Sequence, residues 1–276
     1  MLDRTWLLGV ARREREALGR AIQYTDPGAW GNPSAWQGRS IADVLAHLAA
    51  TDLAAAAVFG EEPAAEVEEY RQTLADERDF SFTGFRDWSV VRRAEQPVHA
   101  LAREWGKAAD LLIARATEVA DEAWHDREVD WFGETLRAGY LVQHRVCQWW
   151  VHGQDIRQGG GQAFRREHDP TWVVNDFAIQ LIPYALSLEG HAFPGMSVRV
   201  DLEEVGEGKW HKSLDGPQPP PDGKKPDVTI EGRGSWFALL ASGRADADTA
   251  LYEGVLVYGG NVTAGEAVLR TLRAFP

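Results

Sequence analysis

The sequence predicts an α+β protein in which an N-terminal four-helix bundle is followed by a smaller α/β domain. Two observations lead to this prediction. Four long segments before residue 160 place apolar residues at helical spacing, and a clear strand alternation, SVRVDLEEV, appears only after the glycine run 159–161. The change of pattern sets the domain boundary, and we expect a helix bundle over 1–162 and a second domain over 163–276.

The first two helices are expected over 2–24 and from Ser40 to about Phe59. Each has apolar residues on one face and polar residues opposite. Ser40 followed by Asp43 has the spacing of a capping box, which predicts the start of the second helix. The glycines and prolines of 27–33 indicate a loop between the two helices.

The third and fourth helices are expected over 98–119 and 135–157. Residues 61–97 are acidic and rich in aromatic side chains, and we interpret them as a partly helical excursion. Residues 124–133 are interpreted as a connection. The glycine run 159–161 is expected to end the fourth helix.

The second domain is expected to begin with an apolar helix over 170–188 that is bent or interrupted at Pro183. A hairpin of strands 197–205 and 209–214 follows. Further elements are expected as a strand at 227–231, a short helix at 235–242, a strand at 255–258 and a closing helix to Phe275, capped by Thr263 with Glu266. The Gly-x-Gly of 232–234 lacks the strand and helix context of a nucleotide-binding loop.

Composition excludes several classes of function. A formal net charge of -13 disfavours nucleic acid and anionic membrane surfaces as partners. Long apolar runs are absent from the sequence, so a membrane-spanning helix is not expected, and the early charges at the N-terminus disfavour a secretory signal. Cys147 is the single cysteine, which excludes an internal disulfide. We therefore expect a cytoplasmic protein that acts on a small-molecule substrate, of undetermined oligomeric state.

The segment YLVQHRVCQWWVHGQDIR, residues 140–157, concentrates the chemistry of the chain. His144, Gln148 and His152 follow one another at intervals of four residues and so form a stripe on one helix face. If the second and fourth helices are neighbours, His47 can join His152 at one metal ion, because imidazole nitrogens suit zinc and other first-row ions. The alternative is that each histidine is an ordinary core or surface residue with a local hydrogen bond.

Two strings give these residues a family context. WQGRSIADVLAHLAATD and QWWVHGQDIR resemble the mycothiol-dependent maleylpyruvate isomerase family, part of the broader DinB-like group, and DVTIEGRGSWFALLASGR resembles the sterol-carrier-like C-terminal domain often attached to it. The resemblance implies a DinB-like bundle that holds a zinc-type divalent metal, with His47 and His152 as ligands. Gln148 stands where the family has glutamate, and a neutral amide oxygen is a poorer ligand than a carboxylate.

Three outcomes of this replacement stay open. Gln148 can ligate weakly beside water, His144 can assist from one turn earlier, or the metal is lost. Asp155 is expected behind His152 as an acceptor for its ring N–H. The resemblance also implies that an arginine of the second domain, best matched by Arg244, holds the carboxylate of the substrate.

The function implied by the resemblance is a metal-dependent isomerase or S-transferase that uses the thiol mycothiol and acts on a small unsaturated acid. Two alternatives remain. A metal-free enzyme on the same scaffold can use His47, His144 and Asp155 for acid–base or cyclisation chemistry on an apolar metabolite. A non-catalytic protein can bind a small molecule in an apolar groove of the second domain.

Overall fold

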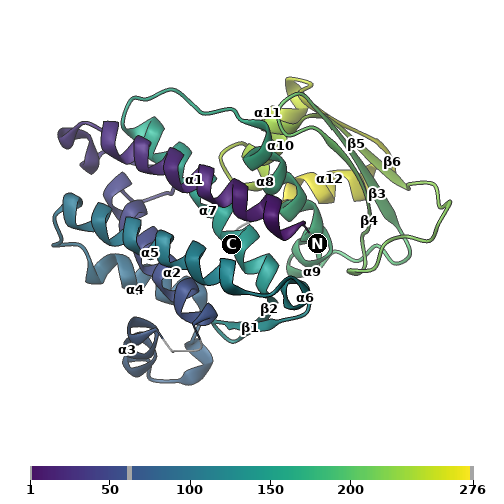
Figure 1. The fold of residues 1–276 in the computed structure, drawn as a ribbon. Helices are drawn as coiled ribbons and strands as arrows, with labels where there is room; N and C mark the ends of the chain where they lie inside the picture. Colours follow the sequence, from purple (N-terminus) through teal and green to yellow (C-terminus); the bar gives the residue numbers. More distant parts are fainter. Residues whose placement is uncertain (1, 61–63, 274–276) are drawn as a thin grey trace. The chain divides into compact units, whose positions relative to one another are not determined.

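The computed structural model describes residues 2–60 and 64–273, and the chain divides into two compact units, Met1–Arg165 and Arg166–Pro276 (Figure 1). This division and the boundary expected from the sequence both fall in the connection between α7 (Ala138–Gly159) and α8 (His168–Gln180). The α+β class is confirmed, with the first unit mainly helical and the second mixed.

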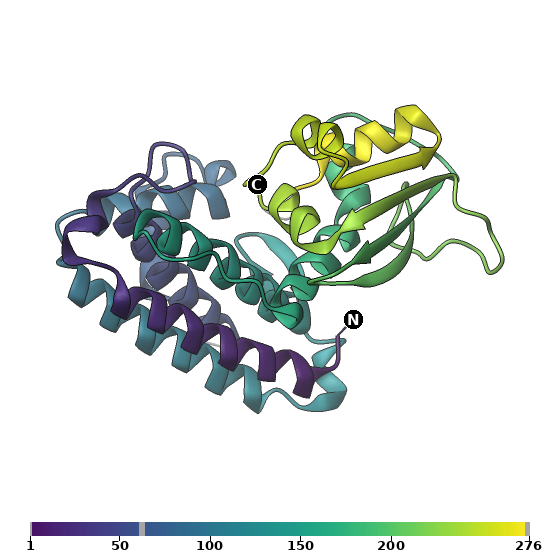
Figure 2. The ribbon, with the colours of Figure 1, turned by 90° about the horizontal axis from the view of Figure 1, so that it is seen from above.

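The first unit is built on α1 (Arg4–Tyr24), α2 (Ile41–Phe59), α5 (Val98–Glu118) and α7, the four long helices that the sequence predicts. Helices α1 and α2 each pack against both α5 and α7. Figure 2 shows α1, in purple, running beside α5. Because α2 and α7 are neighbours, side chains on their facing sides can meet in the bundle core.

The ends of the helices follow the expected signals. Ser40 Oγ accepts a hydrogen bond from the Asp43 amide, and Asp43 Oδ2 accepts one from the Ser40 amide at 2.8 Å, which completes a capping box for α2. Helix α7 ends at Gly159, and Gly161 has a φ of 68° that favours glycine. These caps fix the start of the helix that carries His47 and the end of the helix that carries His152.

The prediction of the fourth helix was wrong at its start. Residues before Ala138 form an antiparallel hairpin of β1 (Glu128–Trp131) and β2 (Glu134–Arg137). Phe132 and Gly133, at φ 55° and 84°, make the two-residue turn, whose twist matches that of paired strands. The short alternating pattern on either side of this turn was interpreted as a connection and as helix.

Short elements complete the first unit. The expected excursion is partly helical where it is described, from residue 64 on, while residues 61–63 lie outside the described residues. Its helices α3 (Ala65–Thr73) and α4 (Phe82–Arg92) both pack against α2. The short elements are η1 (Pro27–Gly31), α3 (Ala65–Thr73), η2 (Glu77–Asp79), α4 (Phe82–Arg92) and α6 (Asp121–Trp124).

The second unit combines a four-stranded sheet with helices that lie on one face of it (Figure 1). The strand order is β4-β3-β5-β6, with β3 antiparallel to β4 and parallel to β5. The expected hairpin and the break of the first helix before Pro183 are both confirmed. The elements are α8, α9 (Ile182–Leu188), β3 (Ser197–Glu203), β4 (Gly208–Ser213), β5 (Val228–Arg233), α10 (Gly234–Ala241), α11 (Ala247–Tyr252), β6 (Leu256–Gly260) and α12 (Val262–Thr271).

The cap of the closing helix differs from the prediction. Asn261, rather than Thr263, caps α12, because its side-chain oxygen accepts from the Ala264 amide at 3.0 Å. The helix ends at Thr271, and Phe275, where it was expected to end, lies outside the described residues. Helix α11 was not predicted.

Helix α2 alone, among the described residues, is long and apolar enough to cross a membrane by length and composition. Of its most apolar window, 78% is buried inside the protein. Its packing against α5 and α7 accounts for this apolar character, as in the core helix of any bundle.

Candidate functional site

Three side chains from α2 and α7 converge in the bundle core. Gln148 Oε1 lies 3.2 Å from His47 Nε2 and 3.0 Å from His152 Nε2. The two imidazole rings are 5.1 Å apart between centroids, and all three residues are buried. The structure thus brings together His47, Gln148 and His152, the three residues predicted as metal ligands.

Asp155 lies behind His152 as the sequence analysis anticipates. Its Oδ2 is 2.9 Å from His152 Nδ1, one helical turn along α7. A carboxylate only accepts hydrogen bonds, so His152 Nδ1 carries the proton and Nε2 presents its lone pair to Gln148. A lone pair then faces the amide oxygen of Gln148. The repulsion between the His152 Nε2 lone pair and Gln148 Oε1 is removed in one of three ways. Nε2 carries a proton, the Gln148 amide is rotated so that its NH2 group faces the ring, or a cation lies between the two atoms.

His47 has a different environment. Its Nδ1 is buried and has no hydrogen-bond partner among the described residues, while Nε2 faces Gln148. Burial, followed by the nearby charges of His152 and Arg145, holds the pKa of His47 well below its usual value. A neutral imidazole is the form that binds a metal or accepts a proton.

His144 occupies an aromatic pocket one turn before Gln148. Its ring lies 5.7 Å from Phe82 and 6.3 Å from Trp131, between centroids. Burial, followed by the charges of Arg145 and His152, lowers its pKa well below the usual value. His144 therefore belongs to the wall of the histidine cluster, and its predicted catalytic role stays a prediction.

A buried ionic network supports the cluster from within the bundle. Asp52 on α2 accepts from Arg145 Nε at 2.8 Å, from Trp149 Nε1 at 2.7 Å and from Trp105 Nε1 at 3.0 Å. Both charged side chains are fully buried. Burial raises the pKa of the Asp52 carboxyl, while Arg145 and the indole donors oppose that rise. These bonds tie α2 to α7 about one turn from His47 and one turn from Gln148.

Trp36 contacts both histidines of the cluster and was not singled out from the sequence. Its ring lies 5.4 Å from His47 and 6.1 Å from His152, between centroids. The guanidinium carbons of Arg39 and Arg86 lie 5.4 and 4.8 Å from the centre of that ring. Trp36 and Arg39 open the family-like string WQGRSIADVLAHLAATD, a signal that could have pointed to them, whereas Arg86 lies in the segment with the least regular pattern.

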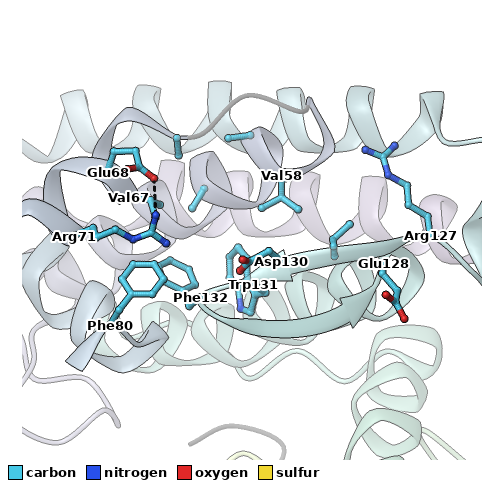
Figure 3. Close-up of a pocket in the computed structure, with 14 residues that line it drawn as sticks. Val58, Val67, Glu68, Arg71, Phe80, Arg127, Glu128, Asp130, Trp131 and Phe132 are labelled. Atoms are coloured by element: carbon cyan, nitrogen blue, oxygen red, sulfur yellow. Dashed lines mark hydrogen bonds and ion pairs between the residues drawn. The ribbon is translucent and has the colours of Figure 1, made fainter. Parts of the chain in front are cut away.

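Two cavities lie near these residues. One, of about 410 Å³, is lined by Asp155, Ala35 and neighbouring residues, so it reaches the carboxylate behind His152. The other, of about 360 Å³, lies between α2, α3 and the β1–β2 hairpin (Figure 3). In Figure 3, Arg71 is paired with Glu68 and extends over Phe80, while Trp131 and Phe132 form part of the wall. Phe82 contacts both Trp131 and His47, so aromatic rings separate this second cavity from the cluster.

Over residues 2–60 and 64–273, no group of three or more His, Cys, Asp or Glu side chains is placed to hold a metal ion. The reason is local, because the third position beside the two histidines is the neutral Gln148. Arg244 belongs to the second unit, in the loop after α10, where its Nη1 donates to the Ser242 carbonyl at 2.6 Å. Its role toward the substrate stays a prediction.

A four-helix bundle with a histidine cluster between two helices, joined to a small α+β unit, defines a DinB-like helix-bundle protein. The sequence profile of the mycothiol maleylpyruvate isomerase N-terminal domain matches residues 11–157, more than half of the chain. The chain belongs to this family.

The chain is also similar to other proteins in sequence or in fold. Two uncharacterized proteins of Mycobacterium tuberculosis, from strains CDC 1551 / Oshkosh and ATCC 25618 / H37Rv, are each 25% identical over 193 residues, which cover 65% of this chain and 71% of theirs. The crystal structure of the mycothiol-dependent maleylpyruvate isomerase shares the fold, with a TM-score of 0.59, 17% identity and 95% of both chains covered. A variant of that enzyme with one histidine replaced by alanine gives the same TM-score at 16% identity.

Proposed function

We propose that this protein is a metal-dependent isomerase or S-transferase that uses a mycothiol-type thiol and acts on a small unsaturated acid. The observation that carries the proposal is the convergence of His47 Nε2 and His152 Nε2 on Gln148 Oε1, at 3.2 and 3.0 Å. Membership of the mycothiol maleylpyruvate isomerase family supports it.

The two distances from Gln148 Oε1 to the histidine nitrogens suit shared coordination of a divalent ion. Ligands bound about 2.0–2.2 Å from a first-row metal ion lie roughly 3.0–3.5 Å apart at neighbouring coordination positions. The separations around Gln148 Oε1 fall in that range. The lone pair of His152 facing the amide oxygen also favours a cation. His47, Gln148 and His152 would hold such an ion, with water completing its coordination.

A bound divalent ion would lower the pKa of a coordinated thiol and so supply thiolate at neutral pH. The residues of the chain then have defined tasks. Asp155 holds His152 in one tautomer, and the half-buried ring of Phe82, which contacts both His47 and His144, restricts water. We assign to Arg244 the binding of the substrate acid.

The reaction proposed is reversible addition of the thiol to an activated carbon–carbon double bond. A bound thiol would supply the nucleophile, whose thiolate would form a carbon–sulfur bond while the electron pair of the double bond moved into the activating carbonyl group. Rotation about the resulting single bond and expulsion of the thiolate would restore the double bond in the other configuration, with no net proton transfer. When the adduct is protonated instead, the product is a thioether and the reaction is an S-transfer.

Zinc content tests the site directly. We expect the untagged protein to take up close to one equivalent of zinc, and His152→Ala to lose it. Gln148→Glu adds one negative charge beside the ion without a change of size, so it should bind zinc at least about tenfold more tightly. Gln158→Glu places the same charge on an exposed position of α7 and is the matched control.

The results of this experiment decide whether the protein binds metal as the proposed function requires. Zinc in the wild type that is lost in His152→Ala supports the proposal and leads to assays of thiol addition. A folded wild type that binds no zinc contradicts it, whether or not Gln148→Glu binds the ion.

A second candidate function is favoured by the His152–Asp155 pair beside a cavity of about 410 Å³. A neutral imidazole oriented by a carboxylate can act as a general base without metal, and Gln148 then serves as a hydrogen-bond partner. In this candidate, chelation of metal leaves turnover unchanged while His152→Ala and Asp155→Asn abolish or reduce it.

A further inference from the structure

Trp36 is a platform at the edge of the histidine cluster. It lies between η1 and α2, is half-buried, and contacts the rings of both His47 and His152. A ligand that reaches either histidine from this side meets the indole ring. The side chains beside Trp36 therefore contribute to the choice of ligand at this site.

Two guanidinium groups flank this ring. Arg86 comes from α4 and Arg39 from the loop before α2, and both stack against Trp36. They share a single carboxylate oxygen, since Asp87 Oδ1 lies 3.2 Å from Arg39 Nη2 and 3.3 Å from Arg86 Nε. Within the described residues, neither guanidinium makes another hydrogen bond. One carboxylate against two guanidiniums leaves a surplus of one positive charge.

The sign of this charge is unusual for the chain. The chain carries a formal net charge of -13, so a positive surplus beside the histidines runs against the overall balance. Arg86 is also one of the charges that act on His47, after burial, His152 and Arg145, in lowering its pKa. The side chains of Arg86 and Arg39 are 18% and 26% exposed, so they are held in place and still accessible.

We propose that Arg86 and Arg39, held against Trp36, form a carboxylate-binding subsite beside the histidine cluster. A guanidinium fork pairs with a carboxylate through two parallel hydrogen bonds, and the free Nη atoms of Arg86 supply such donors. A surplus of one charge matches a single carboxylate, whereas the nearby Asp87 disfavours a phosphate dianion. The inference rests on the proposed function for the identity of the ligand, an unsaturated acid, and concerns a carboxylate other than the one assigned to Arg244.

The test is a binding measurement on the full chain freed of metal with a chelator. Maleamate carries one carboxylate, and maleamide has the same skeleton with none. Titration of each is followed in the indole N–H signals of a nitrogen-15 labelled sample, with the Trp36 signal assigned by its loss in Trp36→Phe.

We expect maleamate to shift the Trp36 signal and maleamide to leave it unchanged. Arg86→Gln should weaken maleamate binding about tenfold or more, since hydrogen bonds to charged groups are among the stronger ones. Arg86→Lys keeps the positive charge but lacks the two parallel donors of a guanidinium. Its affinity for maleamate should lie between those of the wild type and Arg86→Gln. Arg92→Gln is the matched control, because Arg92 lies on the same helix and stacks on Trp88 at 5.2 Å, away from the cluster.

Several results would overturn the inference. These are the absence of maleamate binding in the wild type, equal binding by the wild type and a folded Arg86→Gln variant, and tighter binding of inorganic phosphate than of maleamate. Because these titrations need neither metal nor thiol, their failure leaves the zinc experiment intact. Failure of zinc binding likewise leaves the subsite intact.

Discussion

At the scale of single residues, the pair of Asp52 and Arg145 is the most consequential feature outside the histidine cluster. Both side chains are fully buried, and Arg145 Nη2 also donates to Thr51 Oγ1 at 2.8 Å. Breaking a buried ion pair by neutralising one partner leaves an uncompensated charge, which costs about 3–5 kcal/mol. The helices that carry the site therefore depend on this pair for their mutual position.

We expect Asp52→Asn to lower the free energy of unfolding by about 3–5 kcal/mol, measured by urea denaturation. Asp110→Asn is the control, because Asp110 pairs with Arg15 at 2.7 Å but is 62% exposed, and such a pair contributes at most about 1 kcal/mol. Similar losses in the two variants would show that the buried network does not stabilise the bundle.

Some residues of the site could be predicted from local sequence, and others depend on tertiary packing. His152, Gln148 and Asp155 lie on one helix at intervals that place them on one face, so their proximity follows from helical geometry. His47 required the neighbouring placement of α2, which helix periodicity does not give. Arg86 reaches the cluster through α4, whose position depends on tertiary packing of a segment without clear periodicity.

At the scale of elements, Gly232 shows what the Gly-x-Gly of the second unit does. It lies in β5 with a φ of 146°, and a Cβ there would come 2.2 Å from the Val255 carbonyl oxygen. Gly234 is equally constrained, with the Val205 carbonyl oxygen 2.5 Å from its would-be Cβ. These glycines let β5 and the start of α10 approach neighbouring backbone, which accounts for the motif without a nucleotide.

Replacing Gly232 by alanine should therefore destabilise the second unit by about 3 kcal/mol, because backbone strain and a steric overlap add. The loss should appear as faster amide hydrogen exchange in β5 and β6. Gly216→Ala, at a position with no atom within 4 Å of the new Cβ, should change stability by less than about 0.5 kcal/mol. Unchanged exchange in Gly232→Ala would contradict this account.

Long elements were predictable and short ones were not. The capping box at Ser40 and the glycine run after α7 are local signals, and both helix ends lie where these signals place them. The β1–β2 hairpin escaped because its turn uses Phe132 at a positive φ, a conformation that few sequence rules assign to phenylalanine. Packing against Phe85, at 4.9 Å between ring centres, compensates for that strain.

At the scale of the whole molecule, the buried histidines couple stability to pH. Burial lowers the pKa of both His47 and His144 in the folded protein, so the unfolded chain binds protons there that the folded chain does not. The free energy of unfolding therefore falls as the pH decreases below about 6.5, by up to about 1.4 kcal/mol per pH unit for each histidine.

This coupling predicts that His144→Gln loses less stability than the wild type between pH 7.5 and pH 5.5. The difference should be about 1 kcal/mol, measured by urea denaturation with a chelator present to remove bound metal. His125→Gln, at an exposed position, should retain the full pH dependence. Identical pH dependence in the wild type and His144→Gln would exclude His144 as a source of the effect.

The class of fold and the family could be recognised from sequence because both rest on long segments and extended strings. The roles of Gln148 and Arg244 could not be settled in the same way. For Gln148, metal binding depends on a few tenths of an ångström in the distances from its amide oxygen to the two histidine nitrogens. Arg244 belongs to a different unit of the chain from the histidine cluster, so its role cannot be inferred from local sequence.

Gln148 also has a consequence at the level of the gene. The codons for glutamine, CAA and CAG, differ from those for glutamate, GAA and GAG, only in their first base. Because the two side chains have nearly the same shape, the exchange requires no shift of His47 or His152 on their helices. A descendant of this chain can therefore acquire an anionic third ligand by one point mutation, and a survey of close orthologues should find both codons at this position.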